Sequence, residues 1–110
     1  GVIVFFRTIK AMNEIKPLTA EQIFKLLSDP VRLSVMQQLI DADNKEMTCG
    51  SFKHNVQKAT FSHHIKLLIE AGMLQRREEG VRKYLSIHKS IFDNFPELIT
   101  LITKADISHS

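Results

Sequence analysis

The sequence contains a single cysteine, Cys49, and no tryptophan. A disulfide within the chain is therefore excluded, and this cysteine usage fits a reducing compartment. No apolar run approaches the roughly 20 residues that a membrane-spanning helix needs. The apolar segment at residues 2–6 is too short for the core of a signal peptide and lacks a small-residue cleavage site. From these absences we expect a cytoplasmic protein.

Acidic side chains are missing from residues 47–69, although the whole chain has 12 Asp and Glu residues. The cationic or titratable side chains of this stretch are Lys53, His54, Lys58, His63, His64 and Lys66. Four further cations follow soon after, namely Arg76, Arg77, Arg82 and Lys83. A concentrated positive stretch attracts phosphate and favours a nucleic-acid partner, whereas the net charge of +3 alone is weak evidence. An ordinary solvated face is the alternative interpretation.

The 110 residues correspond to a single domain by length, which we take to span residues 1–110. Thr19 and Gln22 have the spacing of a capping box at the start of a helix. Asp29 and Pro30 are typical of a helix cap and first position, and a strongly apolar helix follows. Residues 1–16 form either an N-terminal helix or an upstream extension, and the sequence favours neither.

Residues 58–71 predict an amphipathic helix that ends at Gly72. Its apolar face consists of Phe61, Ile65, Leu68 and Ile69, and its other face is polar and positive. Residues 74–87 alternate as a β-hairpin does, with Gly80 at the turn. Before this helix, Thr48 is expected to cap a short helical turn at residues 49–52.

The order of these elements predicts a winged helix-turn-helix of the mostly α (α+β) class, with a two-stranded β-hairpin as the wing. The helix at 58–71 would be the recognition helix, which enters the major groove of DNA. Residues 89–105 form a helical segment interrupted at Pro96. Its apolar face suits a dimerisation helix, because a second subunit would cover it. We therefore expect a homodimer bound to double-stranded DNA.

Two segments resemble the ArsR (arsenical resistance repressor) family, and the resemblance covers about residues 20–88. LSDPVRLSVMQQL is similar to the family's "D-P-x-R-L" helix, and KATFSHHIKLLIEAGMLQRREEGVRKYLSI to its recognition helix and wing. The resemblance implies a homodimeric bacterial repressor that binds a palindromic operator. It places DNA-reading positions at Lys58, Ala59, Ser62 and His63. Ala59 departs from the serine often found there.

Residue types and the resemblance together give a predicted set of DNA contacts. The set is Lys58, Ala59, Thr60, Ser62, His63, Lys66, Arg77, Arg82 and Lys83. Neighbouring residues on a strand face opposite sides, and Arg82 is the better phosphate candidate of the last two. His64 points about 100° away from His63, toward the junction of helix and wing or toward a phosphate. Arg32 is expected to be structural, and Tyr84 and Phe61 to support the core or wing.

We expect no metal site and no cofactor. Many members of the family bind a metal through Cys-x-Cys, but here Thr48 and Gly50 stand at the two thiol positions. Residues 89–105 contain no histidine, so a second known site of the family is missing as well. Cys49 is expected to be a small buried side chain, with a redox role as the alternative. A meeting of His88 and His109 across a dimer is a further alternative.

Two other classes of function compete with a DNA-binding regulator. The same fold serves as a protein-interaction module with little specific DNA binding. An enzyme using His63 or His64 would need carboxylates paired with those histidines or a Gly-rich phosphate loop, and the sequence contains neither pattern. We therefore expect a protein that is not an enzyme.

Overall fold

The computed structural model describes residues 18–104, so the predictions for residues 1–16 and for His109 lie outside the described part. The elements, in order, are α2 (Ala20–Leu27), α3 (Pro30–Asp41), β1 (Met47–Thr48), η1 (Cys49–Ser51), α4 (Lys58–Glu70), β2 (Leu74–Glu79), β3 (Arg82–Ile87), α5 (Lys89–Asn94) and α6 (Pro96–Lys104). No helix within residues 18–104 is both long and apolar enough to cross a membrane. The predicted class, mostly α with a small β part, is confirmed.

The starts of α2 and α3 follow the local signals in the sequence. The hydroxyl of Thr19 accepts a hydrogen bond from the backbone N–H of Gln22 at 3.2 Å, and the Gln22 side chain accepts one from the N–H of Thr19 at 2.9 Å. Asp29 Oδ1 accepts from the N–H of Val31 at 2.8 Å, and Pro30 occupies the first turn of α3. Each cap satisfies donors that the helix cannot satisfy itself. The predicted capping box and the predicted Asp-Pro start are confirmed.

The core lies between α3, α4, the sheet and the two C-terminal helices. Its fully buried side chains are Val35, Met36, Leu39, Leu68, Met73, Leu74, Leu85, Ile87, Ile91 and Ile102. Phe61 and Ile65 of α4 join the same cluster, as the apolar spacing predicts. Burial of a side chain of this size stabilises the fold by about 1.5–3 kcal/mol. The core therefore fixes which face of α4 is left for solvent.

The sheet has three strands in the order β1-β3-β2, all antiparallel. The β2–β3 hairpin pairs Leu74 with Ile87 and Glu79 with Arg82, and Gly80 has a φ of 62° at its turn. The predicted two-stranded hairpin is confirmed, and the short strand β1, which the sequence did not predict, pairs with β3. The third strand is only two residues long, and no alternation is detectable over that length.

Asn44 connects the end of α3 to the sheet. Its φ is 54°, in the left-handed region that asparagine tolerates better than most residues. Its side-chain oxygen accepts from the N–H of Ile87 at 2.8 Å, and its amide nitrogen donates to the Ile87 carbonyl at 3.3 Å. The side chain thereby satisfies both backbone groups of a buried strand residue.

The C-terminal segment is two helices, α5 and α6, separated at Phe95 before Pro96. The predicted break at Pro96 is confirmed. Ile102 is 1% exposed within the chain, and the carbonyl of this residue accepts from the Gln37 side chain of α3 at 3.3 Å. The sequence predicted that a second subunit would cover the apolar face of α6. Much of it packs on α3 instead, although Leu101 is 60% exposed.

Candidate DNA-binding surface

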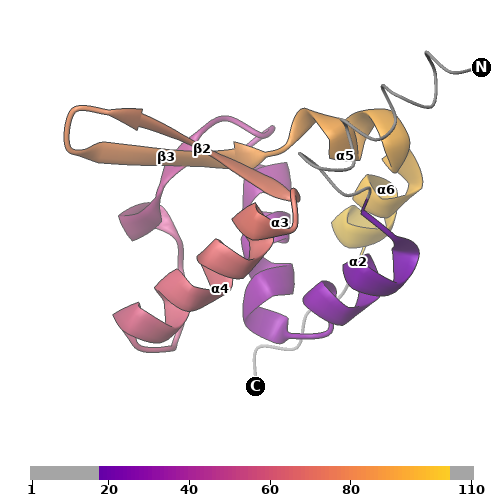
Figure 1. The fold of residues 1–110 in the computed structure, drawn as a ribbon, viewed down its shortest axis with the longest axis horizontal. Helices are drawn as coiled ribbons and strands as arrows, with labels where there is room; N and C mark the ends of the chain where they lie inside the picture. The colour runs from indigo at the N-terminus through magenta and orange to yellow at the C-terminus, as the bar shows by residue number, and fades with distance from the viewer. Residues whose placement is uncertain (1–17, 105–110) are drawn as a thin grey trace, which may run out of the picture.

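Three elements converge on one side of the molecule. Figure 1 shows the free end of the β2–β3 hairpin, η1 and the first turn of α4 at the left, with α5 and α6 at the right. The hairpin projects beyond the helices, as the wing of a winged helix does. A DNA duplex facing this side would meet α4 and the hairpin together.

The outward face of α4 carries every helix residue that the sequence predicts to contact DNA. Lys58, Ala59, Thr60, Ser62, His63 and Lys66 are all exposed. No acidic residue occurs in the first turn, and the Gln57 side chain does not cap the helix. The partial positive charge of this helix end is therefore not offset by a capping carboxylate. Phe61, Ile65 and Leu68 on the opposite face are buried, which keeps the polar face turned outward.

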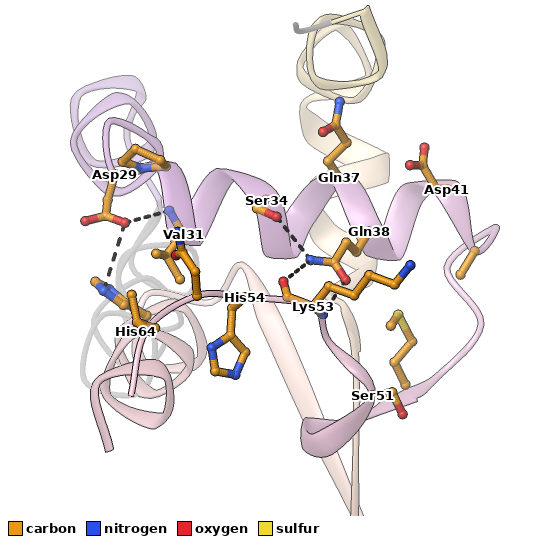
Figure 2. A pocket seen from close by; sticks show the side chains of 15 residues that line it. Asp29, Val31, Ser34, Gln37, Gln38, Asp41, Ser51, Lys53, His54 and His64 are labelled. Carbon is orange, nitrogen blue, oxygen red and sulfur yellow. Dashed lines mark hydrogen bonds and ion pairs between the residues drawn. The ribbon is translucent and has the colours of Figure 1, made fainter. Parts of the chain in front are cut away.

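The segment before α4 adds two cationic or titratable groups that the prediction omitted. The His54 ring stacks on the Phe61 ring, with centroids 3.9 Å apart and planes 8° from parallel. The Gln38 side chain of α3 accepts from the N–H of Lys53 at 2.9 Å and donates to the Lys53 carbonyl at 2.8 Å. Figure 2 shows this contact across a groove between α3 and the segment. The acid-free stretch at 47–69 was the sequence signal for both residues.

Arg82 and Lys83 lie exposed on β3, on alternating sides of the hairpin. Val81 beside them at the turn is 98% exposed. The side chains of Arg82 and Lys83, like that of Arg76 in β2, are exposed and therefore accessible to phosphate.

Arg77, also predicted to contact DNA, is held by carboxylates. Its Nη2 lies 2.8 Å from Glu46 Oε1, its Nε donates to Glu46 Oε2 at 2.8 Å, and its Nη1 lies 2.6 Å from Glu79 Oε2. Its guanidinium carbon sits 4.6 Å from the centre of the Tyr84 ring. The contact ties the wing to the residue before β1. The guanidinium is thus already paired, whereas no ion pair of Arg82 or Lys83 occurs within residues 18–104.

These contacts shift the pKa values of Glu46 and Arg77. Hydrogen bonds from Arg77 lower the pKa of Glu46 below its ordinary value of 4.5, against a smaller opposing effect of desolvation. Hydrogen bonds to Glu46 and then to Glu79 raise the pKa of Arg77 above its ordinary value. Both partners therefore stay charged at neutral pH.

His64 faces neither the junction of helix and wing nor the outer surface, so that expectation is corrected. Its Nδ1 lies 3.0 Å from Arg32 Nη1, at the start of α3. Arg32 Nε donates to the Leu26 carbonyl at 2.6 Å, which confirms the structural role predicted for this arginine. The ring points toward α3 because α4 packs on that helix through Phe61, Ile65 and Leu68.

Cys49 is a free thiol, partly buried against the core at the start of η1. Thr48 precedes this turn, but its hydroxyl contacts the Ser51 hydroxyl and caps no backbone group. In the part of the chain between residues 18 and 104, no three His, Cys, Asp or Glu residues cluster to hold a metal ion. His88 caps α5 by accepting from the N–H of Ser90 at 3.1 Å.

Comparison with known proteins assigns the chain to a family. Residues 27–77 match the model of a helix-turn-helix domain family. The chain is 40% identical over 76 residues to the "uncharacterized HTH-type transcriptional regulator YceK" of Bacillus subtilis, covering 67% of this chain and 75% of that protein. The transcriptional repressor SdpR of the same organism is 29% identical over 87 residues, 76% of this chain and 93% of that protein. An arsenical resistance operon repressor of Staphylococcus aureus is 25% identical over 85 residues, 76% of this chain and 80% of that protein.

These matches agree with the geometry of α4 and the wing. They confirm the predicted DNA-binding transcription regulator. The chain belongs to the ArsR-type family of winged helix-turn-helix transcription regulators.

Proposed function

We propose that this protein is a cytoplasmic repressor that binds a palindromic operator as a homodimer, with α4 of each subunit in the major groove. The observation that carries the proposal is the two-sided character of α4. One face is buried in the core, and the other is exposed, polar and free of acidic residues from its first turn through Lys66. Two relatives carry the word repressor in their names, which supports this direction of control.

Within this proposal, the exposed side chains of α4 divide by chemistry. Ser62 and His63 offer side-chain hydrogen-bonding groups that can read base edges, and Ala59 offers apolar contact. Lys58, Thr60 and Lys66 suit phosphate or base contacts on the flanks of the helix. On the wing, Arg82 and Lys83 are assigned to phosphates. Arg77 is assigned to the support of the wing, because its guanidinium is already paired.

The dimer would use the helices on the side away from α4 and the wing. Large apolar side chains are exposed there on three helices, namely Phe24, Phe92 and Leu101. A second subunit that covered them would remove apolar surface from water. Two-fold symmetry then places the half-site centres about 10 base pairs apart, or a multiple of that spacing.

The experiment is a fluorescence-anisotropy titration with a duplex from the promoter upstream of the protein's own gene, compared with a random duplex. Selective binding supports the proposal, and each lost base contact in Ser62→Ala or His63→Ala should weaken binding by about 1–3 kcal/mol. Glu70→Gln, an exposed change at the other end of α4, is the matched control. Selective binding that is indifferent to Ser62 and His63 would contradict the assignment of the reading face. Absence of DNA binding at low salt would move the assignment to a protein-interaction module.

A further inference from the structure

The recognition helix makes a directional polar contact with the start of α3. His64 contributes its ring from α4, and its side chain is 13% exposed. Its Nδ1 lies 3.0 Å from Arg32 Nη1, and its Nε2 lies 3.9 Å from Asp29 Oδ1. Figure 2 shows His64 beside Asp29 at one end of the groove. None of the DNA contacts proposed above uses this ring.

The chemistry of the partners determines the protonation of the ring. A guanidinium only donates hydrogen bonds, so Nδ1 must accept and carries no proton. The single proton of the neutral ring is then on Nε2, on the side that faces the Asp29 carboxylate. In this tautomer Nδ1 can accept from Arg32, and the Nε2 proton faces the Asp29 carboxylate. In the other tautomer the proton on Nδ1 would face the guanidinium donor.

Arg32 is a rigid partner for this contact. Its Nε is held by the Leu26 carbonyl at 2.6 Å, and its backbone N–H lies 3.4 Å from Asp29 Oδ1. The following turns of α3 are anchored in the core by Val35 and Met36. The guanidinium thus presents its Nη1 donor to α4 from a fixed position.

The contact between His64 and Arg32 restricts the rotation of α4 about its own axis. The apolar contacts of the buried face are non-directional and tolerate small rotations better than a hydrogen bond does. His63, whose ring centroid is 6.4 Å from that of His64, lies on the exposed face beside Ser62. Any rotation that breaks the contact with Arg32 therefore also displaces the side chains proposed to read bases.

We propose that His64 is a positioning residue whose unprotonated Nδ1, held by Arg32, sets the rotation of the recognition helix for selective DNA binding. The proposal rests on the function proposed above. The charged or titratable groups that face the ring are Asp29 from the α2–α3 turn, Arg32 from α3 and His63 from α4 itself.

The test compares His64→Asn and His64→Phe in the full chain, with the promoter and random duplexes. The Asn oxygen stands close to the place of Nδ1 and accepts from Arg32, whereas Phe keeps the ring shape without an acceptor. His64→Phe should lose about tenfold in affinity for the promoter duplex, and His64→Asn should stay within about twofold of the parent. Binding to the random duplex should change in neither variant, because phosphate attraction needs no exact rotation.

Nitrogen NMR of the His64 ring gives a second measurement that does not need the Phe variant to fold. In the DNA-free parent, nitrogen NMR of the ring should show the proton on Nε2 at about pH 8.

The outcomes separate the two proposals. Promoter-selective binding by the parent and by His64→Phe alike would overturn the positioning role alone. A proton on Nδ1 at about pH 8 would do the same. Absence of selective binding by the parent would overturn the proposed function and the positioning role with it.

Discussion

Two arginines of the wing should contribute differently to the salt dependence of DNA binding, because one is exposed and the other is paired with carboxylates. Arg82→Ala and Arg77→Ala each remove one positive charge from the same hairpin, so the two variants have equal net charge. Arg82 is exposed, whereas the Arg77 guanidinium contacts Glu46 and Glu79 and lies over the Tyr84 ring. If Arg82 binds a phosphate and Arg77 supports the wing, the variants differ in their salt dependence.

The expected difference in salt dependence follows from counterion release. Each phosphate neutralised contributes about 0.9 to the slope of log affinity against log salt concentration. A dimer has two wings, so Arg82→Ala should reduce the slope by about 1.8. Over a fourfold rise in salt, the parent then loses roughly twelvefold more affinity than the variant, which is four raised to the power of about 1.8.

Arg77→Ala should leave the slope close to that of the parent and weaken binding by a similar factor at every salt concentration. Its loss frees Glu46 and Glu79 and loosens the wing, but it removes no phosphate contact. Anisotropy titrations between about 50 and about 200 mM salt measure both slopes. A slope reduced as much by Arg77→Ala as by Arg82→Ala would refute the reasoning, because the Arg77 guanidinium would then leave Glu46 for a phosphate on DNA.

Two further predictions concern stability. Asn44→Ala should lower the free energy of unfolding by about 2–4 kcal/mol, measured by urea denaturation, since it loses two hydrogen bonds to Ile87 and strains a left-handed φ. Asp43→Ala, at a φ of 57° but exposed, is the control, and an equal loss there would contradict the role of the Ile87 contact. The pKa of Glu46 is lowered in the folded state, so its bond to Arg77 stabilises the fold above the ordinary pKa of 4.5 and is lost as pH falls through the folded-state value. Melting temperatures recorded from about pH 7 down to about pH 3 should fall more steeply in the parent than in Glu46→Gln, and parallel curves would count against the tether.

The sequence by itself determined the features that depend on near neighbours. The capping box of Thr19 and Gln22, the Asp29 cap and the turn glycine of the hairpin each involve residues within a few positions of one another. The period of Phe61, Ile65 and Leu68 likewise indicates which face of α4 is buried, because the geometry of a helix relates residues three and four apart. These signals are enough for the winged helix and for the exposed face of its recognition helix.

Only the tertiary structure decided which distant residues meet. Arg77 pairs with Glu46 across 31 positions, His64 meets Arg32 across 32, and Asn44 contacts Ile87 across 43. The burial of Ile102 on α3 and the pairing of β1 with β3 are of the same kind. A charged or polar side chain has many possible partners of suitable chemistry along the chain. The packing of the core determines which of these partners lies close enough for contact. For that reason the sequence predicted Arg77 among the DNA contacts and His64 at the junction of helix and wing or at a phosphate. Only the fold shows that Arg77 pairs with Glu46 and that His64 meets Arg32.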